Sequence, residues 1–108
     1  MIFNPSIMDQ IDSASLHPVL PQLLRTLGEL GARRVILYGS RSRGDHAPRS
    51  DFDLAVDAPE LDEAAWSAMQ DAVENTDTLY KIDLVWLQQA PDNLQASILR
   101  DGKVIAGT

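Results

Sequence analysis

Leucines recur at spacings of three and four residues in the first third of the chain. This period predicts an amphipathic helix that begins near Pro18 and ends at Gly31. Proline is accommodated only in or before the first helical turn, so Pro18 and Pro21 both belong to the beginning of this helix. We expect its apolar stripe to back the first strand of the core. The residues of the stripe are Leu20, Leu23, Leu24, Leu27 and Leu30.

Two later apolar runs have the composition of β-strands. Residues 35–38 read Val-Ile-Leu-Tyr and end at Gly39, as a buried strand ends where it meets a turn. Residues 51–56 alternate polar and apolar side chains. Successive side chains of a strand point to opposite faces, so Asp51 and Asp53 project together from the face opposite the core.

The second half of the chain predicts two more helices and two more strands. A helix is expected over residues 61–75, a strand over 79–87, a short helix over 91–100, and a last strand over 103–106 after an Asp-Gly turn. Trp66 lies at the edge of the apolar stripe of the first of these helices, and we interpret it as a partly buried packing residue. That stripe consists of Ala65, Met69, Ala72 and Val73.

Length and composition limit the domain organisation. A chain of 108 residues has room for one domain, assigned to residues 16–108, while residues 1–15 show little periodicity and form an N-terminal arm of unknown role. Neither a membrane span nor a secretory signal is found, so we expect a cytoplasmic protein. The absence of cysteine excludes disulfides and thiolate metal sites, and the spacing of His17 and His46 does not suggest zinc.

The charge distribution argues against a protein that coats nucleic acid, because the formal net charge is -7. From Asp51 to Asp77 there are nine acidic residues and no basic one. We interpret five of these acidic residues as a solvated helix face: Glu60, Asp62, Glu63, Asp71 and Glu74. The basic residues concentrate elsewhere, since five of the nine fall between positions 33 and 49: Arg33, Arg34, Arg41, Arg43 and Arg49.

The segment from Gly39 to Asp53 combines features of a phosphate site and a metal site. Two carboxylates about 4 Å apart repel by roughly 4 kcal/mol at an effective dielectric near 20, so they need a shared proton or a divalent cation. The turn between the two strands reads Gly-Ser-Arg-Ser-Arg-Gly, which favours the cation. Its glycines, the Ser40 hydroxyl and its arginines suit phosphate, and the whole segment suits a nucleoside triphosphate bound as its magnesium complex.

Asp83 is the most informative residue outside this segment. It falls in the middle of the strand predicted at 79–87, among apolar neighbours, where burial without a partner would cost several kcal/mol. One alternative is a buried aspartate paired with Arg or Lys; the other is a site carboxylate. Asp77 competes for the site role but lies before the strand in a polar loop.

The order of these residues resembles a known family. Tyr-Gly-Ser-x-x-Arg-Gly at 38–44, followed by Ser-Asp-x-Asp-Leu at 50–54, is similar to the signature of the DNA polymerase beta-like nucleotidyltransferases, and of their minimal members in particular. The resemblance is strong over residues 35–56, moderate over 79–87, weak over 98–105 and absent before about Leu16. It implies a small α/β (α+β) domain with a mixed sheet of about four strands and helices packed on one face.

The resemblance also implies roles for individual residues. Asp51, Asp53 and Asp83 would form a catalytic triad that binds two Mg²⁺ ions, with Asp83 on the side of the attacking hydroxyl. The turn would bind the phosphates of ATP, the substrate, through Gly39, Ser40, Arg41 and Arg43. Attack at the α-phosphorus with loss of pyrophosphate is likewise an implication of the family.

The resemblance further suggests a partner. Freestanding minimal nucleotidyltransferases are commonly encoded beside a helical HEPN protein, as antitoxin and toxin, and some transfer AMP to a tyrosine of that partner. We therefore expect a protein adenylyltransferase antitoxin of a type VII-like pair, in a hetero-oligomer with a HEPN toxin. Two alternatives remain: an antitoxin that neutralises the toxin by binding alone, and an aminoglycoside-type small-molecule nucleotidyltransferase completed by a partner subunit.

Overall fold

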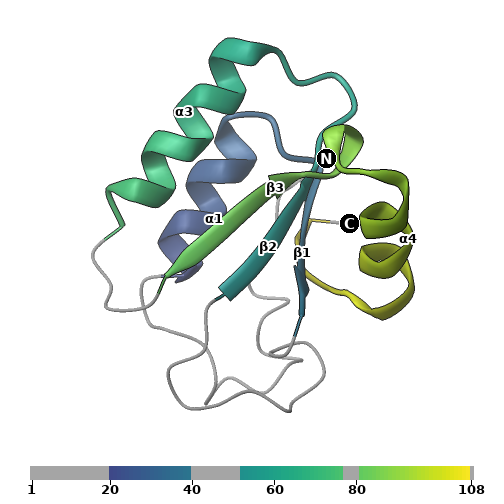
Figure 1. Ribbon diagram of the computed structural model, residues 1–108. Helices are drawn as coiled ribbons and strands as arrows, with labels where there is room; N and C mark the ends of the chain where they lie inside the picture. Colours follow the sequence, from purple (N-terminus) through teal and green to yellow (C-terminus); the bar gives the residue numbers. More distant parts are fainter. Residues whose placement is uncertain (1–19, 40–51, 77–80, 108) are drawn as a thin grey trace.

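A computed structural model describes residues 20–39, 52–76 and 81–107 of the chain (Figure 1). Within these ranges the helices and strands follow the order expected from the sequence pattern, with a short 3-10 helix in addition. The elements are α1 (Leu20–Glu29), β1 (Arg34–Tyr38), β2 (Phe52–Asp57), α3 (Glu63–Glu74), β3 (Ile82–Trp86), the 3-10 helix η3 (Leu87–Gln89), α4 (Asp92–Asp101) and β4 (Lys103–Gly107). No helix among the described residues is long and apolar enough to cross a membrane.

The described strands form one mixed sheet of four, in the order β3-β2-β1-β4. β1 pairs antiparallel with both β2 and β4, whereas β2 and β3 are parallel. Parallel neighbours require a crossover connection, and α3 lies in the connection between β2 and β3. The expected mixed α/β sheet of about four strands is therefore confirmed.

Helices cover both faces of this sheet. α1 and α3 lie together on one face, where the leucines of α1 and Met69 of α3 join the main core, whereas α4 lies on the other (Figure 1). There Ile98 packs with Ile36, Ala55 and Leu87 in a smaller cluster. The expectation of helices on one face thus holds for the two helices nearest the N-terminus and is wrong for α4, whose short apolar stripe gave no sign of the face it covers.

Local signals set most element boundaries. Gly31 follows α1 with a φ of 121°, a conformation that favours glycine and ends the helix as expected. Asp62 is the N-cap of α3, where its carboxylate accepts a hydrogen bond from the Ala65 amide at 2.7 Å. At Leu87 the expectation of a longer third strand is wrong, because this residue already begins η3.

Candidate active site

Three polar side chains lie side by side where β1 ends and where β2 and β3 begin. Asp53 of β2 is in register with Tyr38 of β1 on one side and with Asp83 of β3 on the other. Partners in register point to the same face of a sheet, so Tyr38, Asp53 and Asp83 form one row. The row lies on the α4 face, since Tyr38 packs against the cluster around Ile98. The topology therefore brings together two carboxylates that are 30 residues apart in sequence.

Asp83 is a partly exposed residue of this row. Its side chain is 42% exposed, and its Oδ1 lies 3.6 Å from Nζ of Lys81, whose side chain is 69% exposed. An ion pair with this exposure contributes little to stability, typically about 0 to 1 kcal/mol. The buried ion pair considered from the sequence does not match this environment, whereas partial exposure suits a carboxylate that meets a ligand.

Gly39, which directly follows β1, lies close to the Asp53 carboxylate. Gly39 has a φ of 73°, in the left-handed region that favours glycine. A Cβ atom at this position would overlap Oδ2 of Asp53. Glycine is therefore required here both by the backbone conformation and by the close approach of the Asp53 carboxylate.

The pKa of the Tyr38 hydroxyl responds to its burial and to the two aspartates of the row. Burial raises the pKa of the Tyr38 hydroxyl, and the negative charges of Asp53 and Asp83 raise it further. The phenol therefore stays protonated at neutral pH and can act as a hydrogen-bond donor. The sequence analysis gave Tyr38 no role of its own. Its position directly before Gly39, at the end of a predicted strand, was the signal that could have placed it in the site.

Several predicted site residues lie outside the described residues. Asp51, Ser40, Arg41 and Arg43 belong to this group, as do the competing Asp77 and both histidines. Among the described residues no group of three or more His, Cys, Asp or Glu side chains gathers where it could hold a metal ion. The aligned carboxylates of Asp53 and Asp83 nevertheless provide the hard oxygen donors that Mg²⁺ prefers, so this part of the expected donor set fits the ion.

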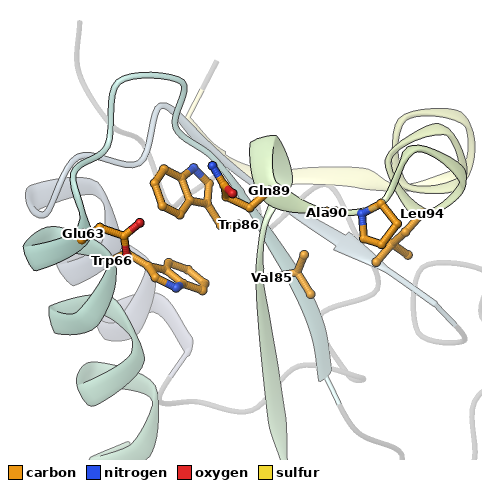
Figure 2. A pocket seen from close by; sticks show the side chains of 8 residues that line it. Glu63, Trp66, Val85, Trp86, Gln89, Ala90 and Leu94 are labelled. Atoms are coloured by element: carbon orange, nitrogen blue, oxygen red, sulfur yellow. The ribbon is translucent and has the colours of Figure 1, made fainter.

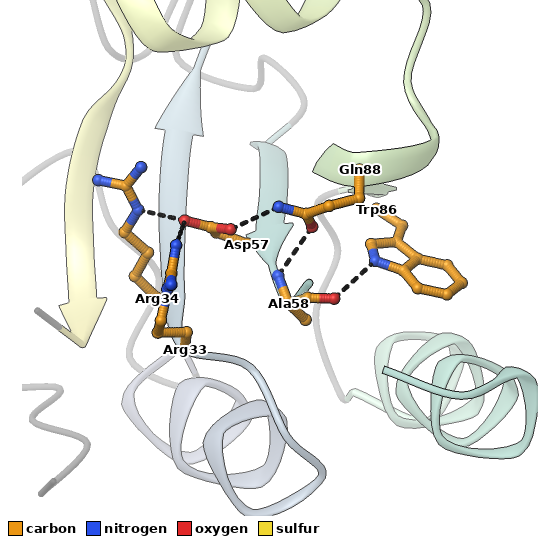
Figure 3. Close-up of polar contacts among 6 residues, drawn as sticks. All are labelled: Arg33, Arg34, Asp57, Ala58, Trp86 and Gln88. Carbon is orange, nitrogen blue, oxygen red and sulfur yellow. Dashed lines mark hydrogen bonds and ion pairs between the residues drawn. The ribbon is translucent and has the colours of Figure 1, made fainter. Parts of the chain in front are cut away.

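A different polar cluster, which the sequence analysis missed, lies at the opposite end of β2. Asp57 is 1% exposed and is the buried charged residue among those the structure describes. Its Oδ2 accepts hydrogen bonds from Arg34 Nε at 2.6 Å and from Arg33 Nη2 at 3.1 Å (Figure 3). Its Oδ1 accepts one from Gln88 Nε2 at 2.6 Å. The carboxylate is thus compensated entirely from within the chain.

Hydrogen bonding extends this cluster to β3. Gln88 Oε1 accepts from the Ala58 amide at 2.9 Å, and the Trp86 indole donates to the Ala58 carbonyl at 3.0 Å (Figure 3). Burial alone would raise the pKa of Asp57, but hydrogen bonds from Gln88, Arg34 and Arg33, with the charge of Arg34, outweigh it and lower that pKa. We conclude that Asp57 has a structural role, joining β1, β2 and the start of η3.

Comparison with known proteins places the chain in a family. Residues 26–108 match the model of the family described as "Polymerase beta, Nucleotidyltransferase". No curated protein shows a significant match.

Comparison with solved structures finds similar chains in toxin–antitoxin complexes. A toxin–antitoxin crystal structure with AMP-PNP contains a chain that is 31% identical, with a TM-score of 0.62; the match covers 81% of this chain and 72% of that one. A chain in the complex of tri-AMPylated Shewanella oneidensis HEPN toxin with MNT antitoxin is 28% identical, with a TM-score of 0.56 and coverage of 81% and 68%. A chain of the MntA-HepT toxin–antitoxin structure is 27% identical, with the same TM-score of 0.56 and the same coverage of 81% and 68%.

The aligned carboxylates, Gly39 beside Asp53 and these matches agree with one another. The solved structures that the chain resembles are toxin–antitoxin complexes, one of them of a HEPN toxin with an MNT antitoxin, and the chain belongs to the polymerase beta nucleotidyltransferase family.

Proposed function

We propose that the chain transfers AMP from Mg·ATP to a hydroxyl group, that of a tyrosine, of a HEPN-type toxin, and so acts as its antitoxin. The observation that carries this proposal is the alignment of Asp53 with Asp83 on parallel strands, beside the close approach of Gly39. A nucleotidyltransferase needs two such carboxylates near a turn that can hold phosphate.

The similarity to toxin–antitoxin structures supports the choice of acceptor. One similar structure holds AMP-PNP, and another contains an AMPylated HEPN toxin bound to an MNT antitoxin. Those properties belong to the similar proteins. They make adenylyl transfer to a protein the reaction to test first in this chain.

Each site residue has a proposed part in the reaction. Asp51, Asp53 and Asp83 would hold Mg²⁺, which when bound supplies positive charge that stabilises the phosphates. The amide of Gly39, the hydroxyl of Ser40 and the guanidinium groups of Arg41 and Arg43 would bind the triphosphate.

Asp83 would act on the nucleophile. The acceptor oxygen forms a bond to the α-phosphorus while the bond to the bridging oxygen of the β-phosphate breaks, and pyrophosphate leaves. The proton of the acceptor hydroxyl passes to the Asp83 carboxylate and then to water. The partial exposure of Asp83 leaves this carboxylate open to an acceptor that approaches from solvent.

The test starts from co-purification. The tagged full chain is co-expressed with its neighbouring gene, and the retained protein is identified by mass. Incubation of the separated proteins with α-³²P-ATP and Mg²⁺ should transfer the label to the HEPN protein. Binding without label transfer would favour neutralisation by contact, and label on an aminoglycoside in place of protein would favour the small-molecule reaction. Ser40→Ala and Arg43→Ala should lower ATP affinity in calorimetry, with Arg43→Lys only partly restoring it.

A further inference from the structure

A hollow of about 460 Å³ wraps around the edge of the sheet at the end of β3 (Figure 2). In the described part of the chain, β3 pairs only with β2, so it forms one edge of the sheet. The hollow is lined by Glu63, Trp66, Val85, Trp86, Gln89, Ala90, Pro91 and Leu94. It therefore joins the start of α3, the edge strand and the start of α4 in one surface.

The wall of this hollow is largely apolar. The rings of Trp66 and Trp86 lie with their centroids 5.7 Å apart, and the Trp66 ring, Val85 and Leu94 border the same space (Figure 2). Trp66 is only partly buried, as expected from the sequence. A partly exposed tryptophan beside aliphatic side chains offers contact area and a ring face for a cation.

The charge around the hollow has one sign. Glu63 lines it, and the neighbouring Glu60 and Asp62 are exposed. Across the hollow, Asp92 follows the lining residue Pro91 and occupies the first turn of α4. Helix N-termini attract anions, but both of these first turns already carry a carboxylate, so a phosphate group would be repelled. The hollow thus suits a cationic group flanked by apolar side chains.

The hollow lies a short distance along β3 from the candidate active site. Val85, which lines it, is two residues after Asp83 on β3 and lies on the same face of the sheet. At about 3.3 Å per strand residue, the two side chains are roughly 7 Å apart along the strand. A bound segment that fills the hollow therefore needs to extend only a short distance to reach the Asp83 carboxylate.

We propose that this hollow docks the acceptor protein through a segment that carries Arg or Lys beside aliphatic residues, and that docking there presents the acceptor hydroxyl to Asp83. The inference rests on the proposed function for the existence of a protein acceptor. The acidic rim, the tryptophan wall and the short path to Asp83 together select a basic amphipathic segment.

The test compares two charge changes that leave the first turns of α3 and α4 unaltered. Gln89→Lys places a cation in the hollow, whereas Gln70→Lys places one on an exposed residue of α3 that does not line it. A second pair, Glu63→Lys with Glu74→Lys as its control, reverses charge at the first and last residues of the same helix, and thermal melting of both variants measures their opposite effects on helix stability. The probes are the purified HEPN protein, titrated by calorimetry, and α-³²P-ATP transfer to it.

Only the two variants that change residues lining the hollow are expected to weaken binding of the HEPN protein. Gln89→Lys and Glu63→Lys should each weaken binding of the HEPN protein about tenfold, the usual scale for an important interface position, and raise the KM for that acceptor. Their affinity for Mg·ATP should equal that of the wild type, as should binding and transfer by the two control variants.

Other outcomes overturn the inference. If wild-type chain labels the HEPN protein and the hollow variants do so with unchanged KM, docking occurs elsewhere while the proposed function stands. If the wild type neither binds nor labels that protein, the proposed function fails and the inference fails with it. Protection of Trp66 from acrylamide quenching in the isolated full chain would show that the chain covers its own hollow. Self-association that Gln89→Lys abolishes would make a second copy the occupant.

Discussion

The two ends of β2 each carry an aspartate, and the two residues differ in the neighbours that the structure describes. Asp57 is buried and accepts hydrogen bonds from two arginines and Gln88. Asp53, four residues earlier on the same face of the strand, is aligned with a second carboxylate, Asp83, and with the protonated Tyr38. Among the described residues, the polar partners of Asp57 are therefore two arginines and Gln88, whereas Asp53 has a second carboxylate as its neighbour in register.

This difference distinguishes an aspartate that stabilises the fold from an aspartate of the candidate active site. At Asp57 the fold supplies the compensating cations, so the charge contributes to stability. At Asp53 the fold places a like charge in the next strand, and two unit charges about 5 Å apart repel by roughly 3 kcal/mol at an effective dielectric near 20. A Mg²⁺ ion arriving with a nucleotide would relieve that repulsion, which makes the Asp53 end a place for a ligand.

The largest effect is expected at the Asp53 end and on activity. Asp51→Asn combined with Asp53→Asn should lower AMP transfer at least a thousandfold, about 4 kcal/mol of transition-state stabilisation, because the carboxylates that hold Mg²⁺ are gone. The thermal midpoint should be unchanged or slightly raised, since repulsion is removed. Label transfer and calorimetric melting measure both. Retained transfer, or a much lower midpoint, would contradict the metal-site assignment.

An aspartate-to-asparagine substitution at the other end of β2, at Asp57, should lower the stability of the fold. Asp57→Asn leaves Arg34 and Arg33 without their anion and should cost about 3 kcal/mol in urea unfolding. This is the lower end of the range for broken buried ion pairs, because the Arg33 side chain is 54% exposed and remains hydrated. Asp71→Asn, which changes an exposed aspartate of α3 outside the first turn, is the control. An Asp57→Asn protein as stable as the control would contradict the structural role assigned to Asp57.

Gly39 tests the contact between the turn and the Asp53 carboxylate. Gly39→Ala should lose about 1 to 2 kcal/mol of stability, because its positive φ disfavours alanine and the added Cβ displaces Asp53. Nucleotide affinity should fall as well. Gly28→Ala, within α1, should instead stabilise the protein by about 0.5 to 1 kcal/mol. Equal effects of the two substitutions in urea unfolding would contradict this account of the turn.

Lowering the pH should have a smaller effect on stability, through protonation of Asp57. The pKa of Asp57 is lowered in the folded state, so its contribution to stability is complete above the ordinary aspartate pKa near 4 and is lost as the pH falls through the lower folded value. The stability difference between wild type and Asp57→Asn should therefore shrink below about pH 4. Urea unfolding at a series of pH values measures it. A difference that stays constant to pH 2 would show that Asp57 is not the titrating group.

The sequence predicted the elements better than it predicted the partners of individual charges. Helical leucine spacing, the strand that ends at Gly39 and the alternation around Asp53 depend on neighbours in sequence, and the structure contains all three. Asp57 was overlooked within an acidic run, because its partners Arg33 and Arg34 lie on another strand and only the β1–β2 register brings them to it. The expected alignment of Asp53 with Asp83 came from family resemblance, since periodicity alone does not give the order of strands.

The most direct test of the central claim is Asp83→Asn, with thermal midpoint and AMP transfer to the HEPN protein measured on the same preparation. Asp83 lies beside Asp53 but is partly exposed and pairs only loosely with Lys81. The account predicts an unchanged midpoint, nearly normal Mg·ATP binding through Asp51 and Asp53, and loss of transfer. A midpoint that falls as far as that of Asp57→Asn, or transfer at the wild-type rate, would contradict it.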